Sequence, residues 1–368
     1  DLRGRNVVIT GVAGTIGQAL LQRVVAERPR GVHGLDIDRA KLGRLAVRHR
    51  GNRAVTLSVA DVRDPLRLRE VMAGAQIVFH AAAMKDVGAC ERDPAAAAET
   101  NVAGTRNVLA AARDAGAFRL VYTSTDKAVH PSSVMGATKL LGERLVSQAQ
   151  ADAPAGSTWS TVRFVNVLGS SASVVPVFHE QIRNGGPVTV TDPRMTRFVM
   201  SLRGAISLIL QPLSGAAGGE IFLPKSNVMC VGDLAAAMIG DAASDSDAVI
   251  GVETIGARFA EKIHEELVTP EEAGRILECD RYYVVPAHGT GVRHDRYDGY
   301  VGPGSLDALH SGQATPMSHT ALRAWLGRHG LLPSCTARLA AAGAQVTAHA
   351  RPAMAAGPRR RRPSDSIP

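Results

Sequence analysis

Residues 6–17, which read NVVITGVAGTIG, decide the fold of this chain. The first five form a short apolar run. Gly11, Gly14 and Gly17 follow at GxxGxxG spacing, with Thr15 and Ile16 between the last two, and residues 18–27 then take up a helical pattern. This pattern predicts a buried strand that passes through a glycine turn into a helix. Because glycine has no side chain, such a turn can approach a pyrophosphate group and place it at the helix N-terminus.

The same alternation of apolar runs and helical segments continues along the first half of the chain. A second strand is predicted to end at residues 34–36, and further strands are predicted at residues 54–59, 77–80, 120–123 and 161–164. Strands that alternate with helices favour a parallel sheet covered on both faces. Later short strands, at residues 188–191, 221–223 and 282–285, lie between helical segments such as 231–238, and this looser pattern predicts a separate, smaller lobe.

We therefore predict an α/β fold, a doubly wound parallel sheet with a smaller C-terminal α/β substrate-binding lobe. Residues 1–167 form the nucleotide-binding domain, to which later segments return, and residues 168–333 form the lobe. Residues 334–368 are rich in Ala, Pro and Arg and have little periodicity, so we expect a disordered tail that ends in an arginine run.

Composition narrows the class of protein. The 368 residues carry a formal net charge of +8, but from Cys335 onward six arginines face one acidic residue, so most of that charge lies in the tail. The remaining, mildly basic body suits an anionic substrate and does not require a nucleic acid. No apolar run approaches the length of a membrane span, and the first strand begins too early to leave room for a signal peptide. Four scattered cysteines and histidines without metal-ligand spacing predict no metal and a reducing, cytoplasmic compartment.

Asp36 turns the glycine pattern into a dinucleotide prediction. It ends the second predicted strand, about 20 residues after the glycine turn, where a carboxylate can bind both hydroxyls of an adenosine ribose. The same charge would repel a 2′-phosphate, and Leu35 stands where an arginine would favour NADP. We predict a Rossmann-type site for NAD, with Arg39 leaving NADP open. The other candidate cofactor residues follow the next strands and are Asp61, Val62, Ala81, Ala82 and Ala83.

The candidate catalytic stretch lies after the strand at residues 120–123. Residues 123–127 read TSTDK, and residues 135–139 read MGATK at the start of a helix. In this region the chain resembles the extended short-chain dehydrogenase/reductase superfamily, whose YxxxK motif supplies a tyrosine base. Here Met135 replaces the tyrosine while Lys139 remains, and a thioether cannot accept a proton at neutral pH.

A narrower resemblance accounts for the methionine. From Gly11 to about Ala287 the chain resembles UDP-N-acetylglucosamine 4,6-dehydratases and related capsule and O-antigen enzymes, and specifically their branch with methionine in place of tyrosine. That branch is membrane-anchored and retains the C5 configuration, whereas we expect this chain to begin at the catalytic domain. The resemblance rests on the segments at residues 80–85, 99–105, 124–129, 174–176, 191–198, 219–225 and 261–266.

The resemblance implies a division of roles among the site residues. Oxidation of C4 by NAD would make the C5 proton acidic, after which an acid and a base must act side by side. Asp126 is implied as the acid at the C6 oxygen, and Lys127 as the base at C5, with its pKa lowered by burial near Lys139 and the nicotinamide. Thr125 would bind the C4 oxygen, and Lys139 and Asn101 would hold the cofactor. The group that takes the C4 hydroxyl proton stays open between Lys139 and Asp126 acting through a water.

The resemblance also implies a set of substrate-binding residues in the second half. Arginines suit a diphosphate because their planar fork matches phosphate oxygens. The candidates are Lys85, Asn166, Val175, Arg194, Arg197, Arg258 and Glu261. Val165, residues 171–172 and Ala260 depart from the family pattern near the expected sugar and phosphates, which leaves the exact sugar open.

We predict a hydro-lyase that converts UDP-N-acetylglucosamine to its 4-keto-6-deoxy derivative and works as a homo-oligomer, a dimer or larger. One alternative is a UDP-sugar 4-epimerase or a C5-epimerising dehydratase. A second is a non-catalytic NAD-binding regulator, which the missing tyrosine favours and the presence of Asp126, Lys127 and Lys139 opposes.

Overall fold

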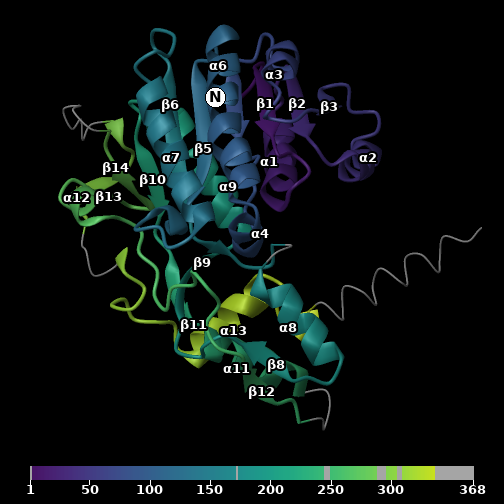
Figure 1. The fold of residues 1–368 in the computed structure, drawn as a ribbon, viewed down its shortest axis with the longest axis vertical. Coiled ribbons are helices and arrows are strands. Elements are labelled where there is room, and N and C mark those ends of the chain that lie inside the picture. The colour runs from purple at the N-terminus through teal and green to yellow at the C-terminus, as the bar shows by residue number, and fades with distance from the viewer. Residues whose placement is uncertain (1, 171–172, 244–248, 288–295, 305–308, 336–368) are drawn as a thin grey trace, which may run out of the picture.

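A large twisted sheet forms the centre of the molecule (Figure 1). The computed structural model describes residues 2–170, 173–243, 249–287, 296–304 and 309–335. Within them the sheet has ten strands in the order β15-β13-β14-β10-β6-β5-β4-β1-β2-β3. The strands from β10 to β3 are parallel, and β14, β13 and β15 add an antiparallel edge. Their bounds are β1 Asn6–Thr10, β2 Gly31–Asp36, β3 Val55–Val59, β4 Ile77–His80, β5 Arg119–Thr125, β6 Thr158–Phe164, β10 Ile221–Pro224, β13 Leu277–Cys279, β14 Tyr282–Val285 and β15 Tyr300–Pro303.

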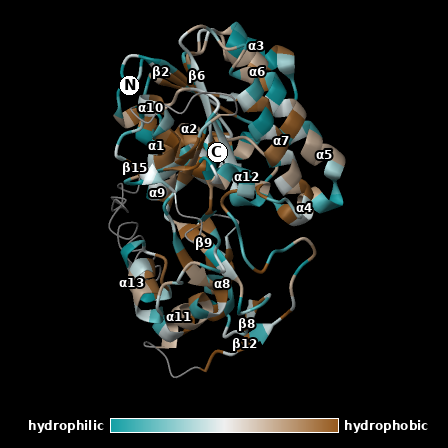
Figure 2. Cartoon of the chain, turned by 90° about the vertical axis from the view of Figure 1, so that its left-hand side faces the viewer, coloured by the Kyte–Doolittle hydropathy of each residue, from teal (hydrophilic) through white to brown (hydrophobic). Residues whose placement is uncertain are grey.

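Helices cover both faces of this sheet, which confirms the predicted doubly wound α/β class. One face packs against α1 (Thr15–Ala26), α2 (Arg39–Arg48) and α9 (Leu202–Leu210). The other packs against α3 (Pro65–Val71), α6 (Gly104–Asp114) and α7 (Val134–Ala149). Figure 2 shows the brown, hydrophobic strands enclosed between these helices. Short helices complete this half: α4 Val87–Arg92, α5 Pro94–Ala98, the π-helical turn η1 Glu99–Ala103, the 3₁₀ turn η2 Asp126–Ala128, α10 Pro212–Gly215 and α12 Pro270–Ala273.

A smaller body lies beyond one end of the large sheet (Figure 1). It holds a three-stranded sheet, β11-β9-β7, and a two-stranded sheet, β12-β8. Buried residues of α8, α11 and α13, among them Phe178, Met238 and Leu322, form its own core. The bounds are β7 Asn166–Val167, β8 Val188–Val190, β9 Thr196–Met200, β11 Asn227–Cys230, β12 Val252–Thr254, α8 Val174–Arg183, α11 Val231–Ala243 and α13 His319–Arg328.

Two of the three short strands that we predicted for the smaller lobe lie elsewhere. Residues 221–223 belong to β10, which pairs with β6, and residues 282–285 form β14, which pairs with β10, so both extend the large sheet. Of the three predicted strands, only the one at residues 188–191 lies in the smaller body, where it forms β8. A short apolar run has the same local pattern whichever sheet it joins, so its partner could not be predicted from that pattern. The predicted tail lies almost wholly outside the described residues.

A buried ion cluster joins the sheet to the segment that returns from the smaller body. The guanidinium of Arg163 on β6 donates to Glu143 of α7 at 2.6 and 3.0 Å and to Glu272 of α12 at 2.9 and 3.1 Å. It also donates to the carbonyl of Leu267. The cluster therefore fixes residues 267–272 against the carboxyl end of the large sheet.

No helix among the described residues is long and apolar enough to cross a membrane. The described residues also contain no group of three His, Cys, Asp or Glu side chains placed to hold a metal ion.

Candidate active site

The glycine turn after β1 is packed too tightly for any side chain at two positions. Gly11 has a φ of 69°, and a Cβ on it would lie 2.7 Å from the backbone nitrogen of Ala82. A Cβ on Gly17 would lie 2.1 Å from the carbonyl oxygen of Gly11. The backbone therefore forms a bare cradle at the N-terminus of α1, which suits a dinucleotide pyrophosphate.

Asp36 lies at the end of β2, beside this turn. Its two carboxylate oxygens accept hydrogen bonds from the backbone N–H groups of Ala13, at 2.9 Å, and Asp38, at 3.0 Å. These bonds orient the carboxylate and leave lone pairs for ribose hydroxyls.

The remaining cofactor candidates differ in their surroundings. Asp61 binds the guanidinium of Arg63 at 2.6 Å, and Val62 is buried against Gly104. The buried amide of Asn101 accepts from the N–H of Met84 and donates to its carbonyl and to Thr138. Asn101 thus holds the segment after β4 in place instead of presenting a free amide.

We predict that the purified protein retains NAD(H) and binds NAD⁺ more tightly than NADP⁺, because Asp36 repels a 2′-phosphate. Replacing Asp36 with alanine should weaken NAD⁺ binding about tenfold or more, the worth of a charge-assisted hydrogen bond. Titration of cofactor-free protein with both cofactors measures the preference. Tighter binding of NADP⁺ would contradict it and would point to Lys41 and Arg44, which line a small cavity together with Gly14 and Thr15.

A cavity of about 830 Å³ opens between the large sheet and the smaller body. It brings together most of the predicted residues: Thr15, Ile16, Ala81, Ala83, Lys85, Thr125, Asp126, Lys127, Met135, Lys139, Asn166, Arg197, Arg258 and Glu261 all line it. Two predicted substrate residues do not. Arg194 is exposed and binds Asp192 at 2.7 Å, and Val175 is buried in the core of the smaller body.

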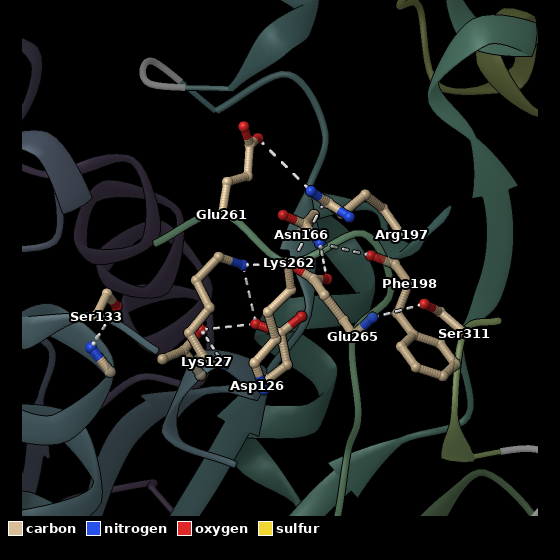
Figure 3. Close-up of polar contacts among 12 residues, drawn as sticks. Asp126, Lys127, Ser133, Asn166, Arg197, Phe198, Glu261, Lys262, Glu265 and Ser311 are labelled. Carbon is tan, nitrogen blue, oxygen red and sulfur yellow. Dashed lines mark hydrogen bonds and ion pairs between the residues drawn. The ribbon is translucent and has the colours of Figure 1, made fainter. Parts of the chain in front are cut away.

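The reactive side chains sit where β5 ends and η2 begins (Figure 3). The hydroxyl of Thr125 donates to Oδ1 of Asp126 at 2.9 Å, and the Lys127 ammonium donates to the same oxygen at 3.1 Å. Asp126 is only 2% exposed, and its Oδ2 has no hydrogen-bond partner in the described part of the chain. A buried carboxylate oxygen without a donor raises the pKa of Asp126 above its usual range.

Glu265 is a member of this cluster that the sequence did not single out. Its carboxylate accepts from Lys127 Nζ at 2.8 Å and from Asn166 Nδ2 at 2.7 Å, and Arg197 Nε lies 3.6 Å away (Figure 3). Arg197 also approaches Glu261 at 3.5 Å. Glu265 stands in the 261–266 segment on which the family resemblance partly rests. Nothing in that segment's pattern distinguishes it from Glu261 or Glu266, because its burial depends on β7 and β9.

The charges in the cluster separate the pKa values of Asp126 and Lys127. Burial first, and then the negative charge of Glu265, raise the pKa of Asp126 to about 7. Burial alone would lower the pKa of Lys127, but the carboxylates of Asp126 and Glu265 outweigh it and raise that pKa. Our expectation counted burial, Lys139 and the nicotinamide ring, and it is wrong for this structure because the carboxylates of Asp126 and Glu265 outweigh burial. The resting cluster holds an ammonium on Lys127.

The pKa of Lys139 is shifted in the opposite direction to that of Lys127. Lys139 is buried, and burial lowers its pKa to about 7 against a weaker, opposing effect of Glu143. Its ammonium donates to the carbonyl of Thr123 and lies 4.2 Å from the centre of the Tyr122 ring. Neighbouring His80 is fully buried between Thr10 and Thr105, and burial lowers its pKa to about 3, so its ring stays neutral. Lys139 is therefore a side chain that can take or give a proton near neutral pH.

Met135 occupies the tyrosine position as an apolar residue. It is 5% exposed, packs with Cys90 and Ala97, and lines the cavity. The next residue, Gly136, allows α7 to approach the catalytic turn, because a Cβ there would lie 2.1 Å from the carbonyl oxygen of Lys127. The start of α7 and η2 are thus packed backbone against backbone.

Ala260, one of the departures from the family pattern, has a φ of 64°, in the left-handed region that favours glycine. We predict that Ala260→Gly raises the free energy of unfolding by about 0.5–1 kcal/mol. Glycine relieves the strain of the left-handed backbone, and the larger conformational entropy that glycine loses on folding offsets part of this gain. Ala115, at a φ of −75°, is the matched control, and Ala115→Gly should lower stability. Urea unfolding measures both variants. A loss of stability in Ala260→Gly equal to that of the control would show that Ala260 carries no strain.

The chain is similar to several known proteins. Residues 7–287 match the polysaccharide biosynthesis protein family. An uncharacterized membrane protein of Methanocaldococcus jannaschii is 38% identical over 78% of this chain and 87% of its own length. A UDP-glucose 4-epimerase of Rickettsia conorii is 34% identical over 80% and 86%. The solved structure of Pen from Bacillus thuringiensis has a TM-score of 0.81 and 33% identity, and the match covers 89% of this chain and 98% of that one.

A more distant solved structure shares the fold. The dTDP-glucose 4,6-dehydratase of Streptomyces venezuelae with NAD bound has a TM-score of 0.63 and 22% identity, over 70% of this chain and 86% of that one.

The parallel sheet, the glycine cradle and the lysine-bearing helix α7 define the fold of the extended short-chain dehydrogenase/reductases, the class to which nucleotide-sugar epimerases and dehydratases belong. Within that class, the chain belongs to the polysaccharide biosynthesis protein family.

Proposed function

We propose that this enzyme removes water from UDP-N-acetylglucosamine and forms the 4-keto-6-deoxy sugar. The observation that carries the proposal is the contact between buried Asp126 and half-buried Lys127, two side chains of opposite charge on the wall of one cavity. Elimination across C5 and C6 needs an acid at the C6 oxygen and a base at C5 in one place. The glycine cradle and Asp36 would hold NAD, which would supply the oxidation at C4 that makes the C5 proton acidic.

Lys139 is the residue that we assign to the C4 hydroxyl proton. A pKa of about 7 leaves a large share of Lys139 unprotonated at neutral pH, as a base for this step requires. Thr125, at the end of β5 and on the cavity wall, would bind the C4 oxygen. Burial of Lys139 thus supplies a proton acceptor where Met135 cannot.

A proton transfer from Lys127 to Asp126 can prepare both the base and the acid that the elimination needs. Lys127 first passes its proton to Asp126, across the 3.1 Å contact. Asp126 is then the acid that the C6 oxygen requires, and the neutral amine of Lys127 takes the C5 proton. After water has left, Lys127 is again an ammonium and Asp126 again a carboxylate, which is the resting pair. No proton has to enter the cluster for this step.

Substrate recognition follows from the charged residues of the cavity. We propose that Arg258 binds the diphosphate, with Lys85 and Asn166 as further polar contacts and Glu261 at the ribose. Arg197 faces the same cavity, where Glu261 and Glu265 lie against it. Arg194 and Val175 are excluded from this set by their positions.

A second candidate is a UDP-sugar 4-epimerase, which reduces the C4 ketone again without loss of water. It is favoured by the relatives named UDP-glucose 4-epimerase, which are 33–34% identical over 80% of this chain. The Asp126–Lys127 pair favours the dehydratase, because epimerisation leaves the C5–H and C6–O bonds intact and needs neither group.

Mass spectrometry of UDP-N-acetylglucosamine incubated with the enzyme separates the candidates. A product lighter by one water supports the dehydratase. An isomer of unchanged mass supports the epimerase and contradicts the dehydratase. No turnover, from protein shown to retain NAD(H), contradicts both for this substrate. UDP-glucose serves as a parallel substrate that tests the sugar assignment.

A further inference from the structure

Glu265 is held in place from several sides before it meets any substrate. Its backbone N–H donates to the Ser311 hydroxyl at 2.8 Å, and its side chain is 4% exposed. One carboxylate oxygen faces Lys127 and the other faces Asn166. A carboxylate fixed at both oxygens and at its backbone has little freedom to move.

The charged neighbours of Glu265 come from two elements. Lys127 and Asp126 lie on η2, and Arg197 lies on β9. Glu261 and Glu266, on the same segment, are directed to Arg197 and to His130. Lys127 therefore lies between two buried carboxylates, those of Asp126 and Glu265. Thr125 donates a hydrogen bond to Asp126.

We propose that Glu265 is a positioning residue of the acid–base pair: its carboxylate holds the Lys127 ammonium against Asp126 and places a second negative charge beside the Asp126 carboxyl. The effect on catalysis rests on the proposed dehydratase function, whereas the effect on Asp126 rests on the geometry alone. Two buried negative charges around the half-buried Lys127 ammonium repel each other, so the weaker-bound carboxyl, Asp126, takes up a proton more readily.

Glu265→Gln removes this charge with little change of shape. Without it, the pKa of Asp126 should fall by about one unit or more, the usual effect of one close charge. Carbon-13 NMR of labelled aspartate carboxyls follows the titration, with Asp126→Asn to assign the signal. The experiment uses the intact protein and needs no substrate. An Asp126 titration that is the same in wild type and Glu265→Gln overturns the proposal.

Glu266→Gln is the matched control, because Glu266 is adjacent in sequence but binds exposed His130 at 3.0 Å. It should leave the Asp126 titration in place. Glu265→Asp keeps the negative charge but moves it away from Lys127, because the aspartate side chain is shorter. The pKa of Asp126 should therefore fall less than in Glu265→Gln. If Glu265→Gln does not fold, Glu265→Asp alone decides: an unchanged Asp126 titration in it overturns the proposal.

A second readout tests the catalytic consequence. In Glu265→Gln the limb of the kcat–pH profile that coincides with the Asp126 titration in the wild type should move to lower pH by the same amount as that titration, with KM little changed. A uniform loss of kcat at every pH would show a merely structural role and overturn the proposal. If wild-type enzyme forms no dehydrated product, the proposed function fails, and the NMR titration still judges the role of Glu265.

Discussion

Lys127→Ala is expected to reduce loss of water from the substrate by about 10²–10⁴-fold, the usual worth of a general acid–base group. The variant loses both the amine that takes the C5 proton and the proton source for Asp126. Oxidation at C4 should survive, because Lys139 and the cofactor cradle are untouched. A 4-keto sugar with its C6 oxygen still present should then accumulate.

Exchange of the C5 proton with heavy water measures this prediction directly. Wild type should place deuterium at C5, and Lys127→Ala should not. Lys225→Ala is the control, since Lys225 pairs with Glu278 at 2.6 Å outside the cavity lining and should leave exchange unchanged. Exchange at the wild-type rate in Lys127→Ala would show that the base is another residue.

Arg163→Met is expected to lower the free energy of unfolding by about 3–5 kcal/mol, because it leaves two buried carboxylates without a counter-charge. The side chains of Glu143 and Glu272 are 1% and 2% exposed, so water cannot replace the guanidinium. The same guanidinium binds the Leu267 carbonyl two residues from Glu265, and its loss should therefore also disturb the acid–base cluster.

Urea unfolding followed by the fluorescence of Trp159, buried in β6, measures the loss. Arg23→Ala is the matched control. Arg23 forms an exposed ion pair with Glu27 on the helical surface, and such pairs contribute less than about 1 kcal/mol. A loss in Arg163→Met no larger than in Arg23→Ala would mean that the buried carboxylates are neutral or otherwise compensated.

Local pattern was enough to predict the first strand, the glycine turn, the helix after it and the end of the second strand. The strand at residues 6–10 and the glycine turn stand where we placed them, and α1 begins at Thr15, slightly earlier than the apolar pattern suggested. Asp36 ends β2 as predicted. These features depend on residues close together in sequence, where strand and helix periodicity and the needs of a tight turn are visible.

Features that depend on distant residues could not be predicted in the same way. Glu265 and Lys127 are 138 positions apart, and their contact adds to that of Asp126 in raising the pKa of Lys127. Arg194 and Arg197 belong to one segment, yet Arg197 lies on β9 and faces the cavity, whereas Arg194 lies in the turn before it and faces solvent. The partners of β10 and β14 are equally non-local.

The most direct test of the account follows the hydrogen on C4. UDP-N-acetylglucosamine carrying deuterium at C4 is incubated with the enzyme, and the product is read by NMR. The proposed dehydration predicts deuterium at C6 of a product that has lost water. Deuterium that remains at C4 of an isomer with its C6 oxygen intact would contradict the account and identify an epimerase.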